Sequence, residues 1–230
     1  MTTLIDYLKR VPLFSHLGEA HLARVASRCR RSACKRGGVL FYKTDTGTEL
    51  YVVLSGRLKA VLIDEDGDEM VLAHFERGAF FGELNLLDGK GRSATVVADE
   101  TAELAVLGRD AFLEMLAEDP KIAVALMGTL AGRLRRANET IEALAFLEVS
   151  ERLVRVFLEE ESGEAGAGEP FIKRNKLTHK ELASLVGASR EAVSKGMKVL
   201  VTKGIVKEGA DHLLVARNAL ELLKSPVRGY

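Results

Sequence analysis

The feature that most constrains the fold of this chain is an apolar stripe at helical spacing, about 27 residues long and uninterrupted by proline. Asp119 and Pro120 are typical of the capping residue and the first residue of a helix. Apolar residues then recur every three or four positions, at Ile122, Leu126, Leu130, Leu134, Ala137, Ile141 and Leu144. At 1.5 Å per residue the helix is about 40 Å long, too long for one small domain to cover. We therefore expect it to pack against the same helix of a second subunit, with a helix lying on its own domain as the alternative.

The composition indicates a well-packed globular protein. The chain has 230 residues, of which 47% are hydrophobic and only four are proline, enough for one large or two modest domains. No apolar run approaches the length of a membrane span, and the N-terminal sequence MTTLIDYLKR lacks the apolar core of a signal peptide. We therefore expect a cytoplasmic protein that makes no contact with a membrane.

The two cysteines, Cys29 and Cys34, form an isolated pair with no second pair and no histidine cluster nearby. An iron–sulfur cluster needs four thiolates, which this chain cannot supply alone. His74 has no second axial candidate and is expected to be structural. The sequence therefore predicts ordinary thiols and no metal or haem.

The net charge of zero conceals an asymmetry. Residues 170–230 carry twelve Lys and Arg against five Asp and Glu, a net charge of +7, and residues 1–169 carry −7. A basic segment that follows an acidic one suggests a polyanionic partner for the C-terminal part. From charge alone, random scatter explains the asymmetry equally well.

A region of short strands precedes the long helix. Residues 1–36 show helical spacing and predict short helices, whereas strand-like runs occupy residues 39–41, 50–54, 58–63, 70–73, 94–98 and 104–107. Glycines separate these runs, and Asp66-Gly67 is a hairpin signal. The pattern predicts a β-barrel or sandwich.

A candidate ligand site lies inside this strand region. Gly82-Glu83-Leu84 is followed, ten positions after the glycine, by Arg92-Ser93-Ala94. A carboxylate accepts hydrogen bonds and suits a sugar hydroxyl, while a guanidinium donates a fork that matches a phosphate. Ser93 and backbone N–H groups near Gly82, at the start of a short helix, would add donors to the anion. A Glu–Arg surface pair on a hairpin is the alternative that the charges alone leave open.

Two helices joined by a glycine turn are predicted over residues 177–200. Thr178 and Glu181 form a capping box for a helix over about residues 179–186, which buries Leu182, Leu185 and Val186. Gly187 supplies the turn, and Ser189 caps the second helix. An earlier helix opens near Ser150, residues 161–169 are expected to form a loop, and residues 204–215 a two-stranded wing.

The second of these helices has one apolar and one polar face. Val193, Met197 and Leu200 face inward, which leaves outward-facing Arg190, Glu191, Ser194, Lys195 and Lys198. Arginine can bond guanine and glutamate can accept from cytosine, so this face suits base readout in a DNA groove. Contacts to backbone phosphates are expected from Thr178, Lys180 and Ser189. A plain helical hairpin is the alternative.

The Gly82–Ala94 segment resembles the phosphate-binding cassette of cyclic-nucleotide-binding domains, and the complete order resembles the CRP–FNR family of bacterial transcription regulators. The resemblance implies an α+β fold with a cyclic-nucleotide-binding β jelly roll over residues 1–118, a dimerisation helix over 119–146 and a winged helix-turn-helix over 147–230. It gives Glu83 the ribose 2′-hydroxyl and Arg92 the cyclic phosphate. By the same match Arg190, Glu191 and Lys195 would read bases.

Other positions bear on the effector and on the DNA sequence. Arg133 matches a family arginine that joins the Glu–ligand network. Ala137 and Asn138 stand where cAMP-responsive members have a Thr followed by Ser or Asn that contact adenine; Asn138 can bond a purine edge and Ala137 cannot. Lys195 replaces a frequent arginine and is a point donor, not a fork. Gly196 lies inside the recognition helix, where glycine costs up to ~1 kcal/mol relative to alanine.

We therefore expect a homodimeric transcription regulator that binds double-stranded DNA and is gated by a cyclic nucleotide, with cAMP as the favoured effector. RNA polymerase is the downstream partner that the resemblance implies. Alternatives are a family regulator with another effector or none, and a nucleotide-sensing subunit that acts on a protein partner. No nucleophile or paired-carboxylate arrangement is identifiable by spacing, so no enzyme is predicted.

Overall fold

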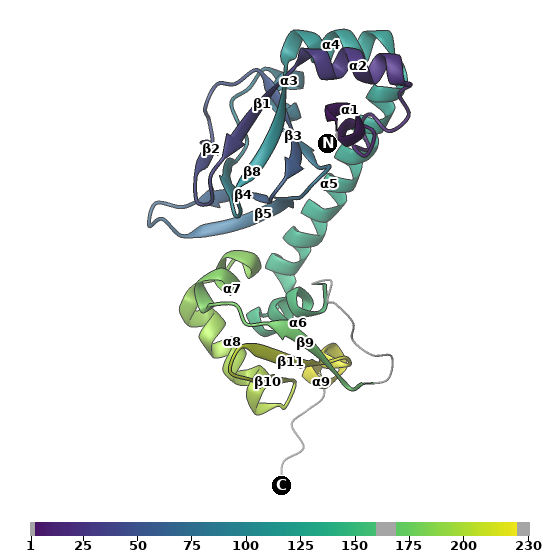
Figure 1. Ribbon diagram of the computed structural model, residues 1–230. Helices are drawn as coiled ribbons and strands as arrows, with labels where there is room; N and C mark the ends of the chain where they lie inside the picture. The colour runs from purple at the N-terminus through teal and green to yellow at the C-terminus, as the bar shows by residue number, and fades with distance from the viewer. Residues whose placement is uncertain (1–2, 160–168, 225–230) are drawn as a thin grey trace. The chain divides into compact units, whose positions relative to one another are not determined.

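The computed structural model describes residues 3–159 and 169–224 (Figure 1). The chain divides into two compact units whose boundary lies between Ala137 and Asn138. The long helix α5 (Pro120–Phe146) crosses this boundary, and its 27 residues match the predicted stripe. Both units mix helices and strands, as the predicted α+β class requires. Among the described residues, no helix combines the length and the apolar character needed to cross a membrane.

Two four-stranded antiparallel sheets form the first unit. Their strand orders are β1 (Cys29–Cys34), β8 (Ala102–Gly108), β3 (Glu49–Ser55), β6 (Phe80–Phe81) and β2 (Val39–Phe41), β7 (Thr95–Ala98), β4 (Leu58–Ile63), β5 (Glu69–Phe75). All six predicted strands are present, and the Asp66-Gly67 turn joins β4 to β5 with Gly67 at φ 82°. Of the two predicted architectures, barrel or sandwich, the two separate sheets correspond to the sandwich.

The prediction of short helices over residues 1–36 is wrong at its C-terminal end. Helices α1 (Leu4–Leu8) and α2 (Glu19–Arg28) do form, but the next six residues are strand β1. The sequence CRRSAC has little strand propensity of its own, and β1 exists because it pairs along its whole length with β8. A pairing partner more than sixty residues away is invisible to local pattern reasoning.

Strand β3 is buried on both of its faces, which explains its unbroken apolar run. Leu50, Val52 and Leu54 face a core shared with α1, α2, α4 (Arg109–Glu118) and the start of α5. Tyr51 and Val53 face the second sheet. Figure 1 shows these helices gathered beside the sheet that contains β3.

Among the described residues, the first half of helix α5 packs against its own unit, and apolar residues farther along are exposed. Asp119 caps it by accepting a hydrogen bond from the Lys121 N–H at 3.0 Å, as predicted. Ile122 and Leu126 are buried in the helix-side core. Farther along the same stripe Leu134 is 64% exposed and Ile141 is 63% exposed. The alternative in which the whole stripe lies on its own domain is therefore wrong for the described residues.

The second unit packs four helices against a three-stranded sheet. These are α6 (Val149–Glu159), α7 (His179–Val186), α8 (Arg190–Thr202) and α9 (Ala219–Lys224), with sheet order β10 (Val206–Glu208), β11 (His212–Ala216), β9 (Phe171–Asn175). Helix α7 has the predicted bounds, and the predicted wing corresponds to β10 and β11. Strand β9 was not predicted. Most of the loop expected over 161–169 lies outside the described residues.

The two helices of the predicted helix-turn-helix motif pack as their patterns indicate, with one exception. Val193, Met197 and Leu200 are buried as predicted, but Leu185 is only half-buried and Ala183 takes the buried position in α7. A Cβ at Gly196 would lie 3.0 Å from Leu153 Cδ1 and 3.4 Å from the backbone nitrogen of Ser150. Glycine is therefore present in α8 because α6 approaches closely at this point.

The turn between α7 and α8 is held by a side chain from α6. Gly187 ends α7 at φ 61°, and the Arg152 Nη1 donates to the carbonyls of Val186 at 2.6 Å and Gly187 at 3.2 Å. A cation at this position satisfies carbonyls that have no intrahelical partner. Arg152 thereby fixes the path of the chain from one helix into the next.

Candidate functional site

A cavity in the first unit lies against the turn that joins β6 to α3 (Glu83–Asp88). Its volume is about 410 Å³, counting the solvent-filled space at its open mouth. Its lining includes six of the seven predicted ligand-binding residues: Gly82, Glu83, Leu84, Arg92, Ser93 and Arg133. The seventh, Asn138, is exposed on α5 and is not part of this lining.

Glu83 is the most unusual side chain in the cavity. It is only 1% exposed, and its Oε1 forms an ion pair with Arg133 Nη1 at 2.6 Å. Its Oε2 is buried and accepts no hydrogen bond from the described residues. A buried carboxylate oxygen without a donor is costly, and native structures rarely leave one unpaired. This oxygen is therefore a ready acceptor for a donor carried by a ligand.

Arg133 ties helix α5 to this cavity. Besides the Glu83 pair, its guanidinium donates to the carbonyl of Phe80 and lies over the rings of Phe80 and Phe75, 5.1 and 5.8 Å from their centroids. The arginine thus satisfies half of the Glu83 carboxylate and anchors α5 to the strand that leads into α3. The Glu83–Arg133 part of the predicted network is present, and the contact of this network with a ligand stays a prediction.

Arg92 adds a buried cation to the lining of the same cavity. It is 5% exposed, and it donates to the carbonyls of Glu49 and Gly82 and to the Asn85 side chain. Burial lowers the pKa of Arg92, since desolvation disfavours the charged form. An arginine remains protonated at neutral pH even so, and the site keeps a desolvated positive charge suited to an anion.

Gly82 has two reasons to be glycine. Its φ is 85°, in the left-handed region that other residues avoid. A Cβ there would also stand 2.6 Å from Arg92 Nη1 and 2.8 Å from the carbonyl oxygen of Glu49. The cassette glycine therefore lets the arginine pack directly against the backbone at the start of α3.

Sequence reasoning missed the aromatic wall of the cavity and the buried Asn85. Phe41, Phe75 and Phe81 line the cavity, with Phe75 and Phe81 stacked at 4.5 Å between ring centroids. Each of the three lies at the end of a short strand, and the alternation within a strand does not say which face meets the ligand. An apolar wall with a few convergent polar groups is typical of a small-molecule site.

The surroundings of His74, Cys29 and Cys34 bear on the prediction that these side chains hold no metal or haem. His74 Nδ1 lies 3.3 Å from Asp99 Oδ2. Across the described residues, no group of three or more His, Cys, Asp or Glu side chains could hold a metal ion. Cys29 and Cys34 are free thiols, and burial raises the pKa of Cys29 to about 11. That thiol is almost fully protonated at neutral pH and is a poor metal ligand.

The second unit presents the predicted polar face of α8. Its outward positions are all exposed, namely Arg190, Glu191, Ser194, Lys195 and Lys198. Ser189 caps the helix by accepting from the Ala192 N–H at 3.2 Å, which leaves its hydroxyl hydrogen available to a phosphate. The Thr178 hydroxyl instead donates to Glu181 at 2.8 Å inside the predicted capping box, and a phosphate contact would have to replace that bond. Lys180 is exposed on α7.

Comparison with known proteins matches each part of the chain to a domain family. Residues 31–119 match the family model of the cyclic nucleotide-binding domain, and residues 151–223 match that of the Crp-like helix-turn-helix domain. The cyclic AMP receptor protein of Thermus thermophilus is 35% identical over 93% of this chain and 96% of its own length. The cAMP-activated global transcriptional regulator Vfr of Pseudomonas aeruginosa is 31% identical over 81% of this chain and 89% of its own length.

Solved structures give the same result. The c-di-GMP responsive global regulator CLP of Xanthomonas campestris superposes with a TM-score of 0.74 at 26% identity, covering 86% of this chain and 99% of that one. The catabolite activator protein of Thermus thermophilus superposes with a TM-score of 0.54 at 33% identity, covering 92% and 96% of the two chains.

The ion pair predicts an asymmetric response to mutation. Arg133→Met should lower the free energy of unfolding by about 1–3 kcal/mol, because it leaves both oxygens of the buried Glu83 without a donor. Adding Glu83→Gln should recover a large part of that loss. Urea unfolding followed by circular dichroism measures both effects.

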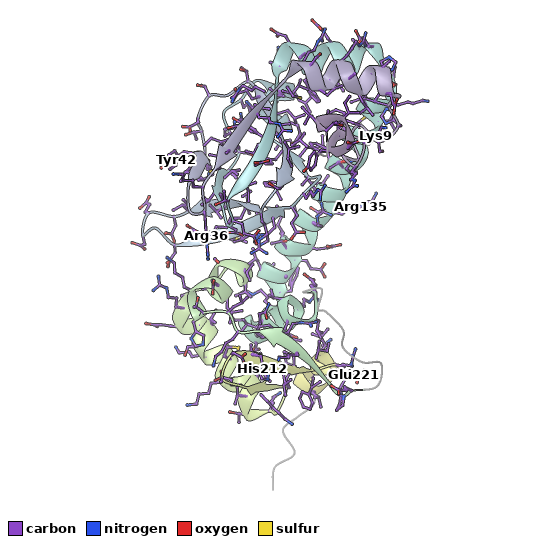
Figure 2. All side chains as sticks on the ribbon, viewed as in Figure 1. Lys9, Arg36, Tyr42, Arg135, His212 and Glu221 are labelled. Carbon is purple, nitrogen blue, oxygen red and sulfur yellow. The ribbon has the colours of Figure 1, made fainter. Side chains whose placement is uncertain are left out.

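Arg135→Met is the matched control, because Arg135 is exposed on the same helix (Figure 2). It should change the free energy of unfolding by less than about 0.5 kcal/mol. Equal losses for the two arginine variants would contradict the structural role given to the Glu83–Arg133 pair.

Proposed function

Because this chain belongs to the CRP/FNR family of transcription regulators, in which a cyclic-nucleotide-binding domain controls a DNA-binding domain, we propose that it is a homodimer gated by cAMP. Like these relatives, it is a transcription regulator and not an enzyme. The observation that carries the effector proposal is the buried, unpartnered Oε2 of Glu83 beside the buried cation of Arg92.

In the proposed complex the Glu83 Oε2 accepts the ribose 2′-hydroxyl. The hydroxyl supplies the donor that this oxygen lacks among the described residues, so binding relieves a desolvation cost already present in the protein. Arg92 takes the cyclic phosphate together with the exposed hydroxyl of Ser93 and backbone N–H groups near Gly82 and Leu84. The aromatic wall accommodates the apolar surface of the nucleotide.

A cyclic mononucleotide fits this donor and acceptor set better than a dinucleotide does. The cavity lining contains one buried carboxylate oxygen that has no partner among the described residues, and one buried guanidinium, that of Arg92; the paired Arg133 is half-buried. One ribose hydroxyl and one phosphodiester match them. The curated relatives include a cyclic AMP receptor protein, whereas CLP is described as responsive to c-di-GMP. Of the two positions expected to contact adenine, Asn138 can hydrogen-bond a purine edge and Ala137 cannot. A different cyclic nucleotide is therefore the second candidate.

Calorimetric titration with cAMP, cGMP, c-di-GMP and 2′-deoxy-cAMP tests the effector. We expect cAMP to bind with the lowest Kd, and 2′-deoxy-cAMP about tenfold more weakly because Glu83 Oε2 would again lack a donor. Arg92→Leu should weaken cAMP binding by about a hundredfold, since the phosphate loses a charge-assisted pair.

Arg135→Leu should leave these affinities unchanged and serves as the control. Unchanged cAMP binding by Arg92→Leu would show that the cassette does not hold the phosphate. A strong preference for c-di-GMP would mean that the effector is a cyclic dinucleotide and not cAMP.

The proposal of a dimer rests on the uncovered part of α5. Met127, Leu134 and Ile141 are seven residues apart and are each 59–64% exposed in the single chain. A seven-residue apolar repeat along one face is the pattern of a two-stranded coiled coil. Ala131 and Asn138 occupy the alternate positions of this seam, and a polar asparagine at such a position helps to set register.

Sedimentation velocity tests the dimer. We expect the unmodified chain to sediment as a dimer and Leu134→Glu to sediment as a monomer, because a charge on each helix would be buried against its copy. Glu139→Lys, on the side of α5 away from the seam, should remain dimeric. A dimer that persists in Leu134→Glu would place the subunit interface elsewhere.

For the DNA-binding part we propose that α8 enters the major groove. Arg190, Glu191 and Lys195 would read bases, while Lys180 and Ser189, and Thr178 after exchange of its capping bond, would contact phosphates. In a dimer the two recognition helices would address half-sites about 34 Å apart. RNA polymerase is the proposed downstream partner.

Binding to a set of single-base operator variants tests this assignment. Arg190→Ala should cost ~1–3 kcal/mol and relax specificity at one base position. Lys180→Ala should weaken binding to every sequence alike and reduce the salt slope by about one. A uniform loss for Arg190→Ala would make Arg190 a phosphate contact. Failure of the chain to bind any DNA in moderate salt would favour a sensor that acts on a protein partner.

A further inference from the structure

Asn85 is a buried amide in the ligand cavity that no expected role explains. It is 6% exposed and lies two residues after Glu83 on α3. Both ends of its side chain are in use: the Oδ1 accepts from Arg92 Nη1 at 2.8 Å, and the Nδ2 donates to the carbonyl of Gly47. The amide is therefore held at one end and holds Arg92 at the other.

The hydrogen bonds of Arg92 show which edge of its guanidinium remains for an anion. Nη1 and Nη2 both donate to the Glu49 carbonyl at 3.1 Å, so the two hydrogens between these nitrogens are used together. The second Nη1 hydrogen serves Gly82 O and Asn85 Oδ1, at 3.2 and 2.8 Å. Of the five donors of a guanidinium, the Nε–H and the neighbouring Nη2–H have no acceptor among the described residues. These two form a fork that matches the oxygens of a phosphate.

The open fork lies next to Gly47, the residue whose carbonyl Asn85 holds. A Cβ on Gly47 would stand 2.5 Å from Arg92 Nη2 and 2.8 Å from Nε, and would fill the space before the fork. Asn85 thus joins the arginine to the loop that borders its free edge. It is also the only side chain to which Arg92 donates among the described residues, since its other acceptors are backbone carbonyls.

We propose that Asn85 is a positioning residue that locks the Arg92 guanidinium with its Nε–Nη2 edge directed at the phosphate of the ligand. The inference rests on the proposed cyclic-nucleotide function and deepens it. The rings of Phe41 and Tyr51, with centroids 4.3 and 5.5 Å from Arg92 Cζ, restrict the plane of the guanidinium. The Asn85 amide restricts its rotation within that plane. A guanidinium whose orientation is already fixed in the ligand-free protein loses less conformational freedom when the anion binds.

The first measurement needs no nucleotide. Nitrogen-15 NMR of the Arg92 side chain in the ligand-free protein should show hindered guanidinium rotation, with separate Nη1 and Nη2 signals. Asn85→Leu keeps the same branched arrangement of side-chain heavy atoms and removes both hydrogen bonds, and it should average or broaden those signals. Leu87→Ala, at a 44% exposed position of the same helix, should leave them unchanged. Unchanged Arg92 signals in Asn85→Leu would overturn the inference.

The second measurement separates positioning from general damage to α3. Asn85→Leu should raise the Kd of cAMP about tenfold, equivalent to ~1.4 kcal/mol. The ratio of the Kd values of 2′-deoxy-cAMP and cAMP should stay as in the unmodified protein, because Glu83 still receives the hydroxyl. A ratio that collapses toward one would mean that α3 as a whole is disturbed, and an unchanged Kd would mean that Asn85 does not act on the phosphate. Either result overturns the inference.

The two measurements also separate this inference from the proposed function. If the unmodified protein binds no cyclic nucleotide, the proposed function fails, and the Arg92 signals alone decide whether Asn85 holds the guanidinium. If cAMP binds but the Arg92 signals do not respond to Asn85→Leu, the function stands and the positioning role fails.

Discussion

The structure of the first unit is organised around a buried carboxylate with half of its hydrogen-bonding capacity unused. Glu83 pairs with Arg133 through one oxygen and leaves the other without a donor among the described residues. Such an oxygen is costly in the free protein and becomes favourable when a ligand supplies a hydroxyl. The glycine turn, the aromatic wall and the buried Arg92 line the same cavity as this oxygen.

The same ion pair connects the proposed ligand site to α5, the helix that carries the proposed dimer seam. Arg133 lies on α5, and the exposed apolar residues Leu134 and Ile141 follow on the same helix. A ligand that donates a hydrogen bond to Glu83 would alter the Glu83–Arg133 ion pair. Because Arg133 is part of α5, the proposed ligand would thereby act on that helix. It can shift the protein between arrangements only by binding one of them better than the other. The proposed gating therefore depends on how strongly the Glu83–Arg133 pair differs between those arrangements.

Local chemistry determined most of the elements. Periodicity and capping signals placed α5 and α7 correctly, and glycine spacing separated the strands of the sandwich. Strands β1 and β9 were missed because each depends on a partner distant in sequence, and Leu185 was placed too deep because its helix is covered less widely than its pattern suggested. The spacing of Glu83 and Arg92 predicted the site, but the sequence said nothing of the partners that orient the arginine.

The sequence by itself determined which chemical groups are available, since the carboxylate, the guanidinium, the glycine turn and the apolar stripe are all visible as letters at fixed spacings. Only the tertiary structure decided which hydrogen bonds those groups make, because acceptors from β3 and α3 and a donor from α5 converge through contacts between residues far apart in the chain. It left Glu83 Oε2 and one edge of Arg92 unused while satisfying their other atoms. Which donors and acceptors remain unused depends on the positions of all neighbouring residues together, so no local sequence pattern predicts it.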